Sequence, residues 1–164
     1  MLQSIKTLLL KLFMPAVYIT AWILKKMGRY KIIGRWDGNQ FVPYLERFYL
    51  FRTKPFAIFI HKFWSGDSDI YLHQHPWAFG NIILCGSYDE VMLDGLFIRK
   101  PGYFRLKRNA NEYHRILLAP GTEGKVWTLF WRWRKSNRWG FLVNGKFIDA
   151  EVYLNNKDAV LEND

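Results

Sequence analysis

Two histidines stand two positions apart in the run His73-Gln74-His75-Pro76-Trp77, near the middle of a chain of 164 residues. Successive side chains of a β-strand point to opposite faces, so in a strand both imidazoles share one face, with Cα atoms about 6.5–7 Å apart. Pro76 favours the strand, because the residue before a proline is disfavoured in the helical conformation. Two imidazoles at that separation can reach one metal ion. The alternative is an exposed His-x-His pair on a strand surface, which needs no metal.

Short runs of β-branched and aromatic residues surround this pair, and Gly, Asn, Asp and Pro interrupt them at close intervals. Such punctuation predicts short strands joined by tight turns. The predicted strands are 47–51, 56–63, 69–75, 80–85, 87–92, 96–100, 103–107, 113–119, 125–132, 139–143 and 146–153. Asn144-Gly145 predicts a type I′ hairpin, and 109–111 predicts another turn. So many short strands indicate an all-β sandwich or barrel, and not an α/β sheet.

The composition excludes several function classes. Cys85 is the only cysteine, so an internal disulfide and a multi-cysteine zinc site are excluded, and a reducing, cytoplasmic location is expected. The sequence contains no phosphate-binding loop, Gly-x-Ser-x-Gly motif or dinucleotide fingerprint. Aromatic and basic residues mix over 127–135, and we interpret this run as a core strand. Nucleic acid is therefore not an expected partner.

Residues 1–35 carry seven basic residues and no acidic one, and so supply most of the net charge of +10. Apolar residues recur every three to four positions over 2–27, which predicts a helix that Pro15 kinks or divides. The uncharged run 12–24 has 13 residues, whereas a membrane-spanning helix needs about 20. Three interpretations stay open: packing on the domain or on a partner chain, attachment to a membrane surface, and a transmembrane anchor.

The order of residues after His75 resembles the cupin superfamily. Gly86 matches the closing glycine of the first cupin motif, and Gly102 and His114 match the glycine and histidine of the second. The resemblance covers about residues 45–150. More narrowly, the run H-x-H-P-W with a later G-x-Y-x-E resembles a group of little-characterised cupins of phages and bacteria. The resemblance to the cupins implies a jelly-roll β-barrel over 36–154. The residues themselves predict the N-terminal helical segment at 1–35 and an acidic, frayed tail at 155–164.

The same resemblance implies a divalent metal held by His73, His75 and His114. Cupins usually add a glutamate, which here would fall where Phe79 and Gly80 stand. Three imidazoles without a carboxylate are similar to the site of the thiol dioxygenases within the cupins, which use iron(II) and molecular oxygen. Zinc or manganese also suits this donor set.

Three hypotheses for function follow from this resemblance. The first is a non-haem iron oxygenase of thiol-dioxygenase type that acts on a small polar substrate. The second is a zinc- or manganese-dependent isomerase or hydrolase-like enzyme. The third is a non-catalytic binding or assembly protein attached through its N-terminal helix.

Five further side chains are candidates for contact with substrate. Tyr88 as a proton donor and Arg105 as an anion clamp are the expected catalytic groups. The expected substrate-binding residues are His61, Glu90 and Arg115. Asp67 and Asp69 could orient an imidazole, but a solvated turn is the preferred interpretation.

The expected partners are a small-molecule substrate and, through residues 1–35, a membrane surface, a partner protein or further copies of the chain in a homo-oligomer.

Overall fold

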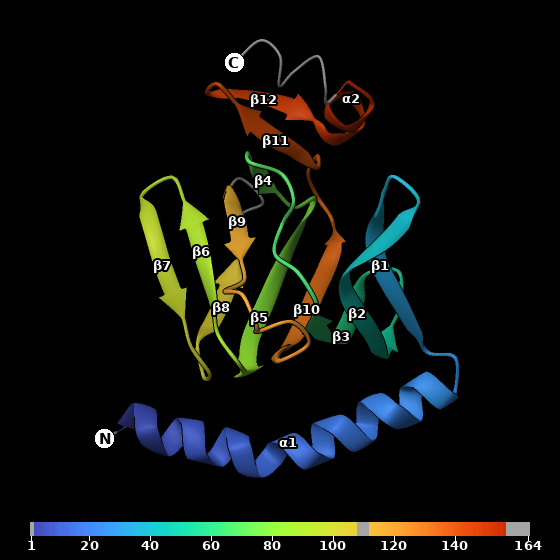
Figure 1. The fold of residues 1–164 in the computed structure, drawn as a ribbon, viewed down its shortest axis with the longest axis vertical. Helices are drawn as coiled ribbons and strands as arrows, with labels where there is room; N and C mark the ends of the chain where they lie inside the picture. The colour runs from blue at the N-terminus through green and yellow to red at the C-terminus, as the bar shows by residue number, and fades with distance from the viewer. Residues whose placement is uncertain (1, 108–111, 157–164) are drawn as a thin grey trace.

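The computed structural model describes residues 2–107 and 112–156, without the side chains of residues 2–7 and 107. A long helix, α1 (Leu2–Lys26), lies along one end of a β-domain, and a short helix, α2 (Ala150–Asn155), follows the last strand at the other end (Figure 1). Two antiparallel six-stranded sheets form the domain. The predicted jelly roll behind an N-terminal helix is therefore confirmed.

The first sheet packs against α1 and has the order β1-β2-β3-β10-β5-β8. Its strands are β1 (Tyr30–Asp37), β2 (Gln40–Arg52), β3 (Phe56–Phe63), β10 (Val126–Lys135), β5 (Trp77–Cys85) and β8 (Phe104–Lys107). The second sheet has the order β12-β11-β4-β9-β6-β7. Its strands are β12 (Lys146–Asp149), β11 (Gly140–Val143), β4 (Leu72–Gln74), β9 (His114–Leu117), β6 (Tyr88–Met92) and β7 (Gly95–Arg99).

The two sheets share one core. Leu45, Ile83 and Val126 of the first sheet form a buried cluster with Tyr88 and Ile116 of the second. Inward-facing apolar residues of the two sheets therefore pack against each other, as in a β-sandwich. This packing fixes the position of the strands that carry the histidines.

A second cluster attaches α1 to the outside of the first sheet. Buried side chains at helical spacing face this sheet: Met14, Val17, Ala21 and Leu24. They pack on Phe48, Ile60, Leu84 and Trp127. The helix is continuous through Pro15, so the interpretation as two shorter helices is wrong. Residues 8–26 are also long and apolar enough to cross a membrane by length and composition, with a mean hydropathy of 1.6.

Several regions differ from the predicted elements. Strand β2 begins at Gln40 and not at residue 47, and β4 covers Leu72–Gln74 and not 69–75, so His75 lies just outside a strand. Residues 30–37 form β1, so the predicted division at residue 35 falls inside a strand. Residues 150–153, predicted as the end of a strand, begin α2, because the Asp149 carboxylate accepts the backbone N–H of Glu151 (3.1 Å) and caps the helix. The predicted turn at 109–111 and residues 157–164 of the acidic tail lie outside the described residues.

The predicted type I′ hairpin is confirmed between β11 and β12. Asn144 and Gly145 both have positive φ, of 48° and 75°. Two successive residues in this conformation are what a type I′ turn requires, and Asn followed by Gly adopts it at little cost.

Candidate metal centre

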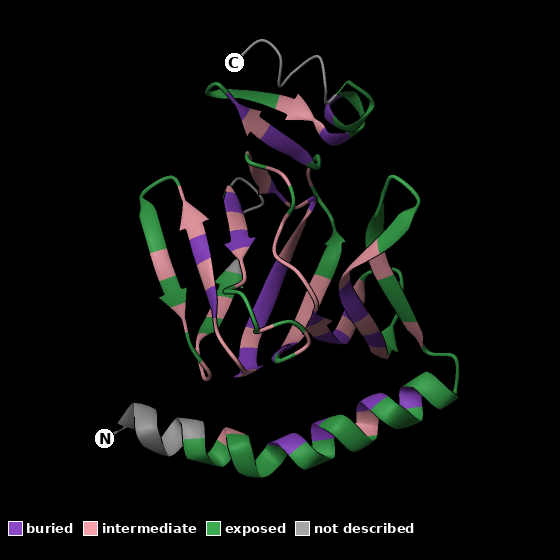
Figure 2. Cartoon of the chain, in the orientation of Figure 1, coloured by how far each residue is buried: buried purple, intermediate pink, exposed green. Residues whose placement is uncertain are grey.

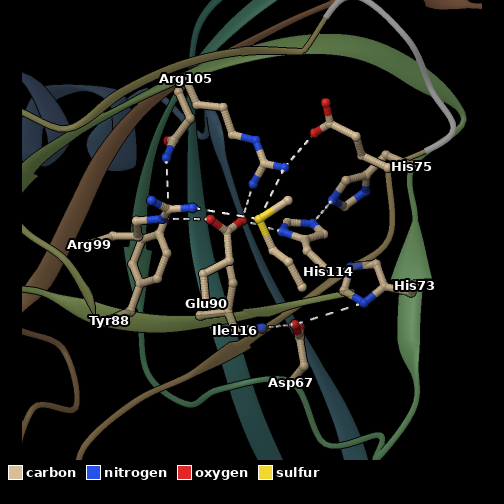
Figure 3. A network of polar contacts seen from close by, with 12 residues as sticks. Asp67, His73, His75, Tyr88, Glu90, Arg99, Arg105, His114 and Ile116 are labelled. Atoms are coloured by element: carbon tan, nitrogen blue, oxygen red, sulfur yellow. Dashed lines mark hydrogen bonds and ion pairs between the residues drawn. The ribbon is translucent and has the colours of Figure 1, made fainter. Parts of the chain in front are cut away.

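Neighbouring strands of the second sheet bring the three histidines together (Figure 3). His73 on β4 stands directly opposite His114 on β9 in the antiparallel register. Side chains at such a paired position lie on one face of the sheet, close to each other. His75 follows the end of β4 and turns its ring toward the same point. One ligand nitrogen from each of the three residues lies within 4.8 Å of the others.

The three rings form a nearly regular triangle. The ring centroids are 5.0 Å apart for His73–His75, 5.0 Å for His73–His114 and 5.1 Å for His75–His114. The Nε2 atoms of His75 and His114 are 3.0 Å apart. Two nitrogen ligands at right angles on one ion, with bonds of about 2.1 Å, are separated by about 3.0 Å. The cluster therefore has the chemistry and spacing of a divalent metal site.

Glu90 fixes the orientation of the His114 ring. Its carboxylate, only 1% exposed, contacts His114 Nδ1 at 2.7 Å. An ionised carboxylate only accepts hydrogen bonds, so Nδ1 carries the ring proton and Nε2 keeps its lone pair for the cluster. The sequence predicts a substrate-binding role for Glu90. In the structure this side chain lines the cavity beside the histidines, but its oxygens bind protein side chains.

Two guanidinium groups complete the contacts of Glu90. Arg99 Nε donates to Oε2 at 2.8 Å, and Arg105 Nη1 donates to Oε1. Arg105 also forms an ion pair with Glu112. Burial alone would lower the pKa of Arg105, but the charges of Glu90 and Glu112 outweigh it, and the pKa is raised. Arg105, the predicted anion clamp, is therefore already paired with two carboxylates.

Asp67 stands behind His73. Its Oδ2 atom lies 3.8 Å from His73 Nδ1 and accepts the backbone N–H of Ile116 at 2.6 Å. Asp67 therefore connects the loop before β4 to β9, and the interpretation as a solvated turn residue is wrong. The Asp69 carboxylate accepts a hydrogen bond from the Tyr153 hydroxyl (3.4 Å).

A cavity of about 110 Å³ opens beside the cluster and is lined by His75 and His114. It is smaller than the pockets of several hundred Å³ that hold drug-sized ligands. The Phe79 side chain forms an aromatic wall of this cavity. Its ring centroid lies 5.2 Å from that of His75 and 5.1 Å from that of Phe130.

Arg47 and His61 form a polar pair in another part of the cavity wall. Arg47 Nε donates to His61 Nε2 at 3.0 Å. Burial, and then the charge of Arg47, lower the pKa of His61 well below 6.5, so the imidazole is neutral. Among the residues that the structure describes, Arg47 forms no ion pair with a carboxylate. A role for Arg47 was not predicted from the sequence.

Two more cavity groups have unused hydrogen-bonding capacity. The Thr128 hydroxyl and the Trp77 indole N–H are buried and have no hydrogen-bond partner among the described residues. Buried polar atoms are normally satisfied, so groups of this kind in a cavity wall are available to bind a ligand or water. Together with Arg47, these groups can donate hydrogen bonds to a small molecule.

The remaining predicted residues occupy different positions. Tyr88 lines the cavity, and its hydroxyl accepts a hydrogen bond from Asn81 Nδ2 (3.2 Å). Burial, followed by the charge of Glu90, raises the pKa of Tyr88, so its proton is held firmly. Arg115 does not line this cavity, because adjacent residues of β9 point to opposite faces and His114 faces inward. Its guanidinium donates to the Ile70 carbonyl at 3.2 Å.

No family model and no curated protein matches the chain. The polyketide cyclase RemF from Streptomyces resistomycificus is similar in structure, with a TM-score of 0.51 and 17% identity over 69% of this chain and 78% of RemF. A structure of iron(II) HppE has a TM-score of 0.49 and 16% identity over 65% of this chain. The chain spans only 57% of the length of HppE.

A sugar phosphate isomerase of the cupin superfamily from Silicibacter pomeroyi has a TM-score of 0.47 and 13% identity, over 65% of this chain and 77% of the isomerase. At these identities the similarity concerns the fold alone. The chain therefore has a two-sheet jelly-roll fold similar to that of RemF, with His73 on β4, His75 just after this strand and His114 on β9.

Proposed function

We propose that this chain is a metal-dependent enzyme that holds iron(II) through His73, His75 and His114. The enzyme would be an oxygenase of thiol-dioxygenase type that acts on a small substrate with an anionic group. The observation that carries the proposal is the convergence of three ring nitrogens within 4.8 Å of one another, at the wall of a small cavity. A buried carboxylate that sets the tautomer of one ligand adds support.

The donor set favours an anionic substrate. A bound iron(II) ion would supply Lewis acidity and open coordination positions for substrate and oxygen. Three neutral imidazoles bring no negative charge, so the positive charge of the site is not cancelled by its ligands. Glu90 does not cancel it either, because Arg99 and Arg105 already neutralise this carboxylate. A thiolate or carboxylate is then attracted to the site.

Arg47 would bind the far end of such a substrate. Its pKa is lowered by burial, which reflects the cost of a guanidinium in the cavity wall without a carboxylate beside it. A substrate carboxylate would provide the missing negative charge through a two-pronged hydrogen bond. Thr128 could donate a further hydrogen bond to it. Phe79 and Phe130 would exclude water from the reacting end.

Oxygen consumption tests this proposal. Metal-free protein is loaded anaerobically with iron(II), zinc or manganese and mixed with a three-carbon thiol carboxylate or with the matching thiol amine. We expect oxygen uptake only with iron(II) and only with the carboxylate, and no uptake in the His114→Ala variant. The Arg47→Gln variant should keep its iron and raise KM about 10-fold or more, the scale of a lost charged hydrogen bond, and Arg47→Lys should recover part of the loss.

Other outcomes point to the remaining hypotheses. Turnover with zinc or manganese and no use of oxygen would replace the oxygenase by an isomerase or hydrolase-like enzyme. If the purified protein retains no divalent metal, the hypothesis of a non-catalytic binding or assembly protein would remain. Either result contradicts the proposed oxygenase.

A further inference from the structure

The outward face of α1 is apolar, although the inward face already packs on the first sheet. At 100° per residue, positions 8, 12, 19 and 23 lie opposite the buried positions 14, 17, 21 and 24. The outward positions hold Leu8, Leu12, Ile19 and Ile23, with Trp22 beside them, and these side chains are between 42% and 72% exposed. Figure 2 shows the buried segments of α1 turned toward the sheets. A helix on the surface of a water-soluble domain normally carries polar residues on this face.

Several basic side chains lie beside the exposed apolar face, here called the outer face of α1 (Leu8, Leu12, Ile19, Trp22 and Ile23). Exposed basic side chains lie on the helix and just beyond its C-terminal end: Lys11, Lys25, Lys26, Arg29 and Lys31. Residues 1–35 contain no aspartate or glutamate. Of these cations, Lys25 has an ion pair, with Glu46 of β2 at 3.7 Å. The border therefore has an excess of positive charge.

We propose that α1 lies flat on an anionic membrane surface, with its outer face among the lipids and its inner face on the β-domain. Apolar side chains would enter the boundary between headgroups and acyl chains, and the cations would meet lipid phosphates and carboxylates. Trp22, exposed by 62%, is a residue type that prefers this interface.

The packing of α1 determines that the helix lies along the surface. Met14 and Leu24, ten residues apart, both contact the same buried cluster, so the helix axis runs along the sheet. The uncharged run 12–24 rises about 20 Å, at about 1.5 Å per residue, whereas the hydrocarbon layer is about 30 Å thick. A spanning helix would also have to leave Phe48 and Trp127 exposed to water. The docked helix therefore fits a surface and not a span.

Charge argues against a second copy of the chain as the occupant of the outer face. Two outer faces packed together would bring two borders of lysine and arginine side by side, and like charges at an interface cost free energy. An anionic bilayer instead gains from the same border. The flat geometry and the charge thus select the same partner.

Vesicle flotation of the full chain tests this inference. We expect binding to vesicles of phosphatidylcholine with 30% phosphatidylserine, weaker binding to phosphatidylcholine alone, and release at high salt. The Leu12→Glu/Ile19→Glu variant should lose binding. The matched control is Leu96→Glu/Ile98→Glu on β7, which changes side chains that are 60% and 65% exposed and should bind as the unmodified chain does.

A charge variant separates lipid electrostatics from apolar contact. Replacing Lys26 and Arg29 by glutamine should weaken binding to the anionic vesicles by roughly 5-fold for each cation and leave binding to neutral vesicles unchanged. Circular-dichroism spectra and thermal unfolding like those of the unmodified chain show that the fold is intact in every variant. Neither readout needs a bound metal, so this test is independent of the enzymatic proposal.

Three results would overturn the inference. One is no preference for anionic vesicles. Another is a full chain that binds no vesicles but self-associates in sedimentation velocity, where the Leu12→Glu/Ile19→Glu variant stays monomeric. The outer face would then be a contact between copies of the chain. The third is resistance to alkaline carbonate extraction from cell membranes, which would make α1 a spanning anchor.

Discussion

At the scale of single residues, Glu90 combines two tasks. Its carboxylate accepts a hydrogen bond from His114 and is the counter-ion of both Arg99 and Arg105. The Glu90→Gln variant keeps the shape of the side chain but removes its charge. We expect its metal affinity to fall about 10- to 100-fold, as measured by competition with a chelator, because the ring of His114 loses its charged partner. The Glu112→Gln variant, which alters a more exposed partner of Arg105, is the control. Equal losses in both variants would contradict this role for Glu90.

His61 predicts a pH dependence of stability. Its pKa in the folded chain is well below 6.5, whereas an unfolded histidine titrates near 6.5. Below about pH 6.5 the unfolded chain therefore binds a proton that the folded chain does not bind, and the free energy of unfolding decreases as the pH falls. His61→Gln keeps an acceptor for Arg47 and removes this contribution. Urea denaturation of both metal-free proteins at pH 7.5 and 5.5 measures it, and an unchanged pH dependence in the variant would show that the prediction is wrong.

At the scale of secondary structure, the close approach of β5 and β10 depends on Gly80. Gly80 pairs with Trp131, and a Cβ atom at position 80 would overlap the Trp131 indole. The Gly80→Ala variant should lower the free energy of unfolding by about 1–3 kcal/mol, the usual cost of overpacking. Adding Trp131→Leu should recover part of this loss in a double-mutant cycle by denaturation. Additive effects of the two substitutions would contradict the predicted clash.

Strands with a clear buried face could be predicted from the sequence. The range of β3 matches its prediction, and the hairpin between β11 and β12 was marked by Asn144-Gly145. Strand β1 could not be predicted, because most of its residues are exposed and no alternation of apolar and polar residues marks it. Helix α2 was missed because its N-cap, Asp149, is the last residue of β12, so no turn signal separates the strand from the helix.

The candidate site was predictable only in part. The three histidines carry a motif with known spacing, and the structure brings them together. Their supporting contacts depend on which strands are neighbours. Asp67 reaches β9 across 49 positions, and Arg47 reaches His61 because β2 and β3 are paired. Strand register is set by the whole sheet and not by local sequence, so these contacts could not be read from the chain.

At the scale of the whole molecule, α1 completes the covering of the first sheet. Removal of residues 1–27 would expose Phe48, Ile60, Leu84 and Trp127, which are between 2% and 8% exposed in the intact chain. Each such side chain contributes about 1.5–3 kcal/mol when fully buried, so we expect a loss of several kcal/mol and aggregation. Thermal unfolding and size-exclusion chromatography measure both effects. A truncated chain that is monomeric and as stable as the full chain would show that α1 is not part of the packed fold.

The metal bound per chain is the most direct measurement on the candidate site. Elemental analysis of protein purified without chelators should give about one divalent ion per chain. The ion should be lost in His73→Ala, His75→Ala and His114→Ala, and kept in His61→Gln, which changes the one histidine outside the cluster. Full metal content in any of the three cluster variants would contradict a single ion held by these three imidazoles.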